Sequence, residues 1–324
     1  MSNWYVNDKK KKKRKISIIM KIKQIILLAG ILLGMQLHSQ QDPMYTQYMF
    51  NMLSVNPAYT GSKDAISILG LHRTQWVGIE GAPTTQTLSI HGPVYGKNMG
   101  LGLSLVNDAI GKTHQTQVFI DYSYMIHLSG NSKLRFGLQG GFSVFQTNYN
   151  NSTIREGGDN SIFNYTGKLL PNIGVGLFYY GERGYLGLSM PKLLTNYVKG
   201  NNDVEVGRVR RHLFFEGGYV FDLNDKIKFK PSFMLRAVYG APLSLDLSGM
   251  FYLYDHLGLG LAMRREDSFS GLINYYFDNG LFLGYAYDFT RTPLRNYSRG
   301  THEFALGYDF GLLSKKKIRS PRFF

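Results

Sequence analysis

The sequence predicts an all-β protein, a transmembrane antiparallel β-barrel of about fourteen strands in a bacterial outer membrane. Two patterns predict this fold: apolar and polar residues alternate along most of the chain, and short connections alternate with long ones. A third observation, a basic and then apolar N-terminal segment, predicts export from the cytoplasm.

The alternation is clearest along residues 243–253. In a β-strand, successive side chains point to opposite faces, so this segment has one apolar and one polar face. The apolar face consists of Leu243, Leu245, Leu247, Phe251 and Leu253. The polar face consists of Ser244, Asp246 and Ser248. The pattern recurs without an amphipathic helix to cover the apolar faces, and lipid is the simplest cover for so many of them.

The composition fits a barrel and excludes several other classes. Gly (37), Tyr (23) and Phe (21) are abundant, and charged residues make up only 18% of the chain. A bundle of membrane helices would need about 20 consecutive apolar residues for each span, which the chain does not offer. The absence of cysteine excludes disulfides, thiolate metal sites, Cys nucleophiles and a lipoprotein anchor.

Residues 1–39 read as a secretory signal peptide. A run of basic residues from Lys9 to Lys15 precedes the apolar residues 25–34, and the small Ser39 ends the segment. Met20 is a second candidate for the translation start. Nucleic-acid binding, the other reading of a lysine run, is disfavoured by the apolar segment that follows. Residues 1–39 hold nine Lys and Arg and one acid, which leaves 28 basic and 21 acidic residues of the 37 and 22, a net charge of +7.

Residues 40–62 show no strand alternation and are expected to form a periplasmic N-terminal lead-in. A short helix is expected to end before Asn56-Pro57, because the residue before a proline disfavours the helical region. The lead-in is expected either at the periplasmic mouth of the barrel or inside the lumen, with its Asn, Gln and Tyr side chains bonded to the wall.

The barrel is expected over residues 63–313, followed by a basic C-terminal tail over 314–324. The fourteen predicted strands are 65–76, 84–94, 98–108, 113–128, 132–147, 171–181, 184–190, 210–222, 226–239, 243–254, 257–266, 268–278, 280–290 and 300–312. Each is predicted from period-two alternation and from turn residues at its ends.

The length of each connection depends on whether it follows an even-numbered or an odd-numbered predicted strand. Those after even-numbered strands are short, such as Gly96-Lys97 and Asp255-His256, whereas several after odd-numbered strands are long, namely 77–83, 148–170, 191–209 and 291–299. Outer-membrane barrels have tight periplasmic turns and long outer loops. A soluble sandwich has no reason to sort its loops in this way.

The inward faces of the strands are polar and of mixed sign. Their charged residues are Asp121, Arg135, Glu216, Asp222, Lys228, Lys230, Arg236, Asp246, Asp288 and Asp309. Charges in a lumen set ion selectivity or pair into a network that closes it. Mixed signs favour a hydrogen-bonded, plugged interior over a strongly selective pore.

No motif predicts an enzyme, a metal site or a cofactor. The histidines lack the spacing of a ligand set, and the chain contains neither GxSxG nor a Walker A loop. Ser123 and His127 share one face of a predicted strand, which leaves an envelope lipid enzyme as an alternative. A polar lumen wall would produce the same pair.

Three segments resemble the PorP/SprF family of type IX secretion and gliding-motility outer-membrane proteins. The first runs from Gln41-Asp42-Pro43 through Gln47-Tyr48 to Asn56-Pro57-Ala58-Tyr59-Thr60-Gly61. The second is Arg73-Thr74-Gln75-Trp76-Val77-Gly78 followed by Gly81-Ala82-Pro83-Thr84-Thr85, and the third is Gly300-Thr301-His302-Glu303 with Tyr308-Asp309-Phe310. The candidate residues for partner contact that match these motifs are Asp42, Pro43, Gln47, Tyr48, Asn51, Asn56, Pro57, Tyr59, Arg73, Gln75, Trp76, Gly300, His302 and Glu303.

The resemblance implies a non-enzymatic barrel, without cofactor, that assists the export or surface anchoring of large cargo proteins such as adhesins. Its partners would be type IX secretion components, the cargo and outer-membrane lipid, and not nucleic acid. Arg73 to Pro83 is expected on the first outer loop, where Trp76 either contacts cargo or lies in the interfacial aromatic belt. Asn56-Pro57 is expected to be a turn into the first strand. A passive diffusion channel is the alternative function.

Overall fold

A computed structural model describes residues 43–63, 65–147, 165–199 and 205–311. The chain divides into two compact units. Of the first, residues 1–39 with Gly240–Pro242, only the short turn at 240–242 is described. The second, residues 40–239 with 243–324, contains every strand and is the barrel considered below.

The strands run in chain order, and the described residues also contain three short 3-10 helices. The strands are β1 (Ala65–Thr74), β2 (Thr84–Pro93), β3 (Met99–Ile110), β4 (Thr113–His127), β5 (Lys133–Thr147), β6 (Tyr165–Tyr180), β7 (Gly184–Met190), β8 (Asn196–Lys199), β9 (Glu205–Val209), β10 (His212–Tyr219), β11 (Phe221–Asn224), β12 (Ile227–Val238), β13 (Ser244–Leu253), β14 (Leu257–Arg264), β15 (Ser268–Tyr276), β16 (Leu281–Thr290) and β17 (Thr301–Gly311). The helices are η1 (Met52–Ser54), η2 (Pro57–Tyr59) and η4 (Pro293–Asn296). In the described part of the chain, no helix is long and apolar enough to cross a membrane.

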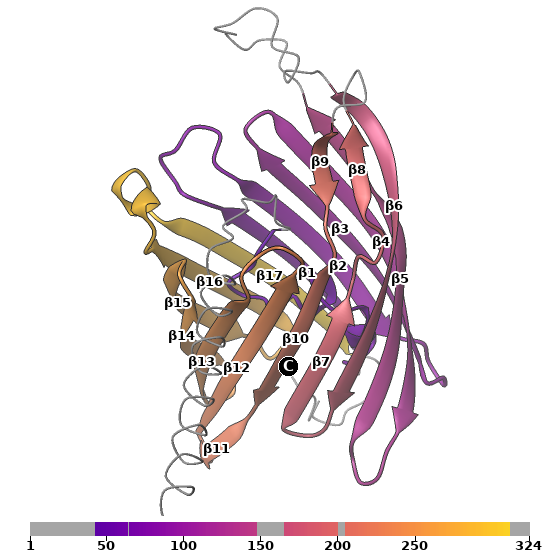
Figure 1. The fold of residues 1–324 in the computed structure, drawn as a ribbon. Helices are drawn as coiled ribbons and strands as arrows, with labels where there is room; N and C mark the ends of the chain where they lie inside the picture. The colour runs from indigo at the N-terminus through magenta and orange to yellow at the C-terminus, as the bar shows by residue number, and fades with distance from the viewer. Residues whose placement is uncertain (1–42, 64, 148–164, 200–204, 312–324) are drawn as a thin grey trace, which may run out of the picture. The chain divides into compact units, whose positions relative to one another are not determined.

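The main sheet closes on itself as a fourteen-stranded antiparallel barrel (Figure 1). Neighbouring strands pair in chain order, and β1 pairs with β17 from Ala65↔Gly311 to Thr74↔His302. β10 and β11 together form a single barrel strand, because both pair with β12 on either side of Val220. Pairing of the first strand with the last closes the sheet, so the described barrel has no free edge strand of the kind that an open sheet has.

The predicted strands are confirmed, and most end within two residues of their expected bounds. β6 begins at Tyr165 instead of 171, because the strand continues through Pro171. The expected loop 191–209 contains the separate hairpin of β8 and β9. The remainder of the expected loop at 148–170, residues 148–164, lies outside the described residues.

The connections divide the barrel into two ends. At one, which we call the short-turn end, lie turns such as 128–132 and 254–256. At the other, the long-loop end, lie residues 75–83, the β8–β9 hairpin and residues 291–300. The long-loop end is uppermost in Figure 1.

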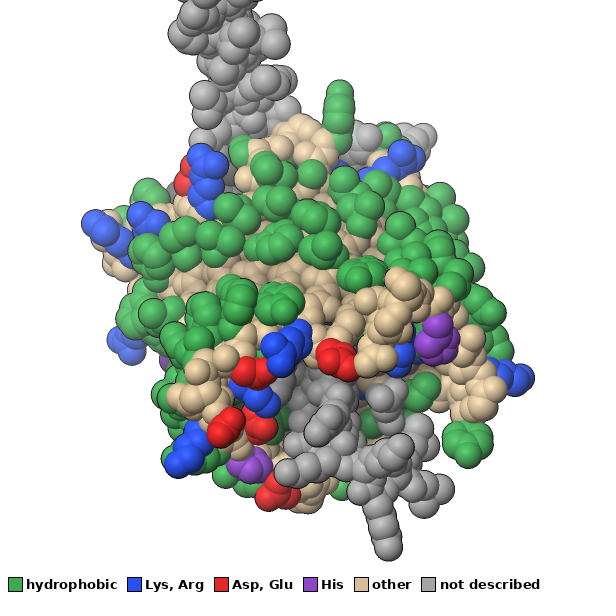
Figure 2. All heavy atoms as spheres, turned by 90° about the horizontal axis from the view of Figure 1, so that it is seen from below, with side chains coloured by type: hydrophobic (Ala, Val, Ile, Leu, Met, Phe, Trp, Pro, Cys, Tyr) green, Lys and Arg blue, Asp and Glu red, His purple; other side chains and the backbone are tan. Residues whose placement is uncertain are grey.

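The two faces of the wall differ as the alternation predicts. On β13, Leu247 and Phe251 are exposed, whereas Asp246, Ser248 and Tyr252 are buried. Leu and Ile side chains such as Ile120 (63% exposed) cover the outside, and in Figure 2 hydrophobic side chains form a broad band with the charged ones mainly outside it. A lipid bilayer covers such a band in an outer-membrane barrel.

The lead-in folds inside the barrel, which decides between the two positions that the sequence allows. We call residues 43–62 the plug. Instead of one α-helix it forms turns and the helices η1 and η2. Asn56 caps η2 by accepting a hydrogen bond from the Ala58 backbone N–H (2.9 Å), and Pro57 occupies the first helical position, where no N–H is required.

Candidate functional site

The lumen of the barrel is occupied by the plug, and the contacts between the two form the candidate functional site. The buried residues of the plug include both polar and apolar side chains. They are Tyr45, Thr46, Gln47, Tyr48, Met49, Asn51, Met52, Leu53, Val55, Asn56, Pro57, Ala58, Tyr59, Thr60, Gly61 and Ser62. A segment buried to this degree needs partners for its backbone groups.

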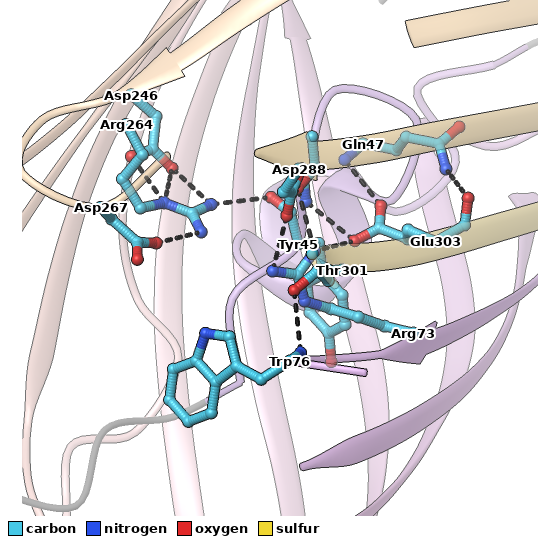
Figure 3. Close-up of polar contacts among 12 residues, drawn as sticks. Tyr45, Gln47, Arg73, Trp76, Asp246, Arg264, Asp267, Asp288, Thr301 and Glu303 are labelled. Atoms are coloured by element: carbon cyan, nitrogen blue, oxygen red, sulfur yellow. Dashed lines mark hydrogen bonds and ion pairs between the residues drawn. The ribbon is translucent and has the colours of Figure 1, made fainter. Parts of the chain in front are cut away.

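Glu303 on β17 holds the start of the plug (Figure 3). Its Oε2 accepts a hydrogen bond from the backbone N–H of Thr46 (2.9 Å), and its Oε1 accepts one from the backbone N–H of Gln47 (2.7 Å). Arg73, which faces Glu303 in the register of β1 and β17, also donates to Oε2 (2.9 Å). Hydrogen bonds to an ionised acceptor are about twice as strong as neutral ones.

Asp288 on β16 adds a second carboxylate to this site. The Thr46 hydroxyl donates to Asp288 Oδ1 (2.7 Å) and accepts from Arg73 Nη1 (2.9 Å). Arg73 Nη2 pairs with Asp288 Oδ2 (2.8 Å). We call Thr46, Arg73, Asp288 and Glu303 the anchor cluster. Three strands, β1, β16 and β17, are thereby tied to one residue of the plug.

A second buried arginine lies beside the anchor cluster. Arg264 donates to both oxygens of Asp246 (3.0–3.1 Å), to Asp267 Oδ2 (3.3 Å) and to the backbone carbonyl of Tyr45 (3.3 Å). Figure 3 shows this group next to Asp288.

These two groups contain more carboxylates than arginines. Two arginines, Arg73 and Arg264, face four carboxylates, those of Asp246, Asp267, Asp288 and Glu303. The side chains of Arg73 and Glu303 are only 2% and 1% exposed. Buried charge is costly unless it is paired and hydrogen-bonded. The backbone N–H groups of Thr46 and Gln47 supply further hydrogen-bond donors to the buried carboxylate of Glu303. The same two bonds satisfy backbone groups of the plug.

The middle of the plug is bound to the opposite wall. Asn56 Nδ2 donates to Glu216 Oε1 on β10 (2.8 Å) and to the carbonyl of Leu177 on β6 (3.0 Å). On β7, the Ser189 hydroxyl donates to the carbonyl of Val55 (2.6 Å). Asn56-Pro57 is therefore more than the expected turn, because the side-chain amide of Asn56 also joins the plug to β6 and β10.

The last residues of the plug contact β2, β4 and β5. The Thr60 carbonyl accepts hydrogen bonds from the Ser123 hydroxyl (2.6 Å) and from Arg135 Nη1 (3.2 Å). The backbone N–H of Gly61 donates to Nδ1 of His91 (3.1 Å). The plug thus bridges the lumen from one side of the barrel to the other.

Apolar contacts fill the space between these polar ones. Met49, Met52, Leu53 and Tyr59 belong to one buried cluster with residues of the barrel wall. The ring of Tyr59 packs edge-on against Phe178 on β6, with the ring centroids 5.4 Å apart. Fully burying a large apolar side chain contributes roughly 1.5–3 kcal/mol, so this cluster adds to the stability of the plugged state.

Two wall glycines make room for the plug. A Cβ at Gly137 would collide with the backbone of Ala58, and a Cβ at Gly176 would collide with the side chain of Asn56. Any larger residue at these positions forces the plug or the strand to move. The glycines of the alternating strands are therefore part of the shape of the lumen.

Burial also affects the tyrosines of the plug. It raises the pKa of the Tyr48 phenol well above its ordinary value of 10.0, and it raises the pKa of the Tyr59 phenol in the same direction. For Tyr59 the negative charge of Asp309 adds to the effect. Both phenols therefore stay neutral at physiological pH.

The structure brings together eight of the fourteen residues singled out from the sequence. Six lie in the buried part of the plug, namely Gln47, Tyr48, Asn51, Asn56, Pro57 and Tyr59. Arg73 and Glu303 lie on the wall and contact the plug. Pro43 is half-buried at its start, and Asp42 lies outside the described residues.

The other four candidates lie near the long-loop end; they are Gln75, Trp76, Gly300 and His302. The first outer loop begins at Gln75, so Arg73, which was expected in that loop, belongs to β1 instead. Trp76 is half-buried, has a φ of +48°, and donates its backbone N–H to the Thr301 hydroxyl (3.1 Å). Gly300 has a φ of +90° and accepts a hydrogen bond from Val77 (2.9 Å).

His302 lies on the outer face of the wall, where its Nδ1 is 2.8 Å from the Tyr285 hydroxyl. Thr46, Arg264, Glu216 and Asp288 also take part in the contacts between the plug and the wall, and none of them is among the fourteen candidate residues. The sequence places Glu216, Asp288 and Asp246 on the inward faces of their strands, and this position is the one indication that they could contact the plug.

Two further sequence interpretations change. The Ser123 hydroxyl is bonded to the plug, whereas His127 is exposed at the end of β4, so contacts with the plug explain the position of Ser123. Asp222, expected on the lumen face, is exposed at the short-turn end and pairs with Arg183 (2.9 Å).

Comparison with known proteins gives one family and a set of similar folds. The family model described as type IX secretion system membrane protein PorP/SprF matches residues 37–308. The CymD monoaromatic hydrocarbon channel superposes with a TM-score of 0.50 at 11% identity, over 86% of this chain and 96% of that one. The outer membrane protein Omp33 of Acinetobacter baumannii gives a TM-score of 0.46 at 8% identity, over 78% of this chain and 100% of its own. No curated protein matches the chain.

Proposed function

Because this chain belongs to the PorP/SprF family of type IX secretion system membrane proteins, we propose that it is a non-enzymatic partner protein of that system. In this proposal it assists the export of large cargo proteins, such as adhesins, or their anchoring at the cell surface. The chain is an outer-membrane barrel, and its family implies association with components of the secretion machinery.

The plugged lumen is the observation that supports this proposal over passive diffusion. Residues 45–62 cross the barrel with most of their side chains buried, and they bond to β1, β4, β5, β6, β7, β10, β16 and β17. An interior in which the plug is bonded to these strands and packed against the apolar residues of the wall leaves little room for solute. The working surface of such a barrel is then its loops and turns.

The long loops are the proposed surface for cargo. Outer-membrane barrels place long loops outside and short turns in the periplasm. On this orientation, residues 75–83, the β8–β9 hairpin and residues 291–300 face outward. Residues Gln75, Trp76 and Gly300 lie in these loops, and the half-buried ring of Trp76 offers an aromatic contact of the kind found in interface hot spots.

The test uses a clean deletion strain and a tagged copy of the barrel. We expect the tagged barrel, extracted in detergent, to co-purify with secretion components and with a large secreted protein, identified by mass spectrometry. That protein should be lost from the cell surface in the deletion strain and return on complementation. Normal surface display of every type IX cargo in the deletion strain would contradict the proposal.

A passive diffusion channel is the second candidate, since the fold is shared with CymD, a monoaromatic hydrocarbon channel. At 11% identity this likeness concerns the fold alone. Reconstitution in planar bilayers separates the two candidates, because a channel conducts steadily and a plugged barrel does not.

A further inference from the structure

The direction in which the plug crosses the lumen follows from its partners at each end. Its start lies at the level of the long-loop end. The carbonyl of Tyr45 accepts a hydrogen bond from Arg264, which is the last residue of β14 before the turn at 265–267. Arg264 also bonds to Asp267 within that turn (3.3 Å).

The next two residues lie at the same level. Thr46 and Gln47 bond to Glu303, the third residue of β17, which begins directly after the connection 291–300. Asp288, the other partner of Thr46, is two residues from the end of β16 and from the same connection. Three separate strand ends, those of β14, β16 and β17, thus place residues 45–47 near the long loops.

The end of the plug lies at the short-turn end. Thr60 accepts from Arg135, the third residue of β5 after the turn at 128–132. Lys63 pairs with Asp309, two residues before the end of β17 (3.2 Å). The chain then enters β1 at Ala65 and runs back toward the long loops.

We infer that the plug enters the lumen from the long-loop mouth and leaves it at the short-turn mouth. Pro43 and Met44 are half-buried, whereas every residue from Tyr45 to Met49 is buried. The start of the plug therefore opens onto the mouth that carries the long loops. This path differs from the periplasmic lead-in that the sequence suggests. The path itself follows from the contacts above, and only the statement that the long-loop mouth faces the outside of the cell rests on the proposed function.

The inference identifies which kind of partner reaches the plug. A secreted protein outside the cell meets Pro43 and Met44 beside the loops 75–83 and 291–300. A periplasmic partner meets Lys63 and the short turns. A partner that binds the start of the plug competes first with the anchor cluster, while the contacts of residues 51–62 remain in place.

The chain contains no cysteine, so single cysteines report position without background labelling. We would compare P43C and M44C with two exposed reference variants. Y297C lies in the connection 291–300 (77% exposed), and Y95C lies in a short turn (91% exposed). Each is treated with a membrane-impermeant maleimide in intact cells, then after permeabilisation, and finally after denaturation to define full labelling. Heat-modifiable migration on gels confirms that each variant is folded.

Labelling of P43C in intact cells together with Y297C, while Y95C labels only after permeabilisation, would support the inference. If P43C follows Y95C, the inference is wrong. If it labels only after denaturation, the start of the plug does not open onto either mouth and the inference is also wrong. If Y95C and Y297C exchange places and P43C follows Y297C, the path through the lumen stands and the orientation in the proposed function fails.

Discussion

Glu303 shows how a single residue of the barrel wall binds the start of the plug. Its two oxygens accept from two backbone N–H groups and from Arg73, at distances of 2.7–2.9 Å, with the side chain 1% exposed. Alternation in the sequence predicts that such residues face inward. It does not predict their partners, because Thr46 and Glu303 are 257 positions apart and no local pattern connects them.

The substitution Glu303→Gln removes the charge but keeps a side chain of similar size. We expect it to lower the free energy of unfolding by about 2–3 kcal/mol, because Arg73 keeps only Asp288 as a charged partner and the single carbonyl oxygen of Gln accepts from one plug N–H while its NH2 group faces the other. Thermal unfolding in detergent measures the change. Glu266→Gln is the matched control, because that side chain is 75% exposed and should change stability by less than about 0.5 kcal/mol. Equal effects of the two variants would show that the anchor cluster does not stabilise the fold.

The buried tyrosines of the plug predict a loss of stability in alkali. Because burial raises the pKa of Tyr48 and Tyr59 above the unfolded value of 10.0, the folded state holds their protons more tightly. Their contribution is fully present below pH 10 and is lost as the pH rises above it. The unfolding temperature, measured from pH 7 to 11.5, should fall less steeply in the double variant Tyr48→Phe, Tyr59→Phe. In the control Tyr95→Phe, at an exposed position, the slope should match that of the wild type.

At the scale of elements, the sequence predicts the wall better than the plug. All fourteen barrel strands are read from period-two alternation, and residues 244–253 of β13 match the expected 243–254. Proline disfavours a strand interior, so the expected start of β6 at Pro171 is six residues late. The hairpin of β8 and β9 escapes prediction because strands of four and five residues are too short to show alternation. Partners in the wall determine the fold of the plug, so its own sequence predicts little of it.

The close contact between β5 and η2 predicts which glycine keeps the lumen closed. Gly137→Val places a side chain against Ala58 and should displace η2, so that the variant conducts ions in planar bilayers where the wild type does not. Gly140→Val on the same strand is the control, because a Cβ at Gly140 meets no atom within 4 Å. A silent Gly137→Val barrel of unchanged thermal stability would mean that the plug tolerates the extra volume.

The whole molecule combines a lipid-facing wall with an interior held together by polar contacts. Its outer surface needs only apolar residues at alternate positions, which is why the fold is readable from sequence and is shared with a barrel of 11% identity. The interior depends on contacts between distant segments. All three motifs that resemble the PorP/SprF family meet there, through Thr46, Arg73 and Glu303 and through the bond from Trp76 to Thr301.

The claim that this barrel is a plugged partner protein, and not a channel, is tested most directly by single-channel recording in planar bilayers. The intact protein is compared with a variant that lacks residues 43–62. We predict that the intact barrel is silent, because the plug fills its lumen, and that the plugless barrel conducts steadily. Steady conductance by the intact barrel, at the level of the plugless variant, would contradict the account.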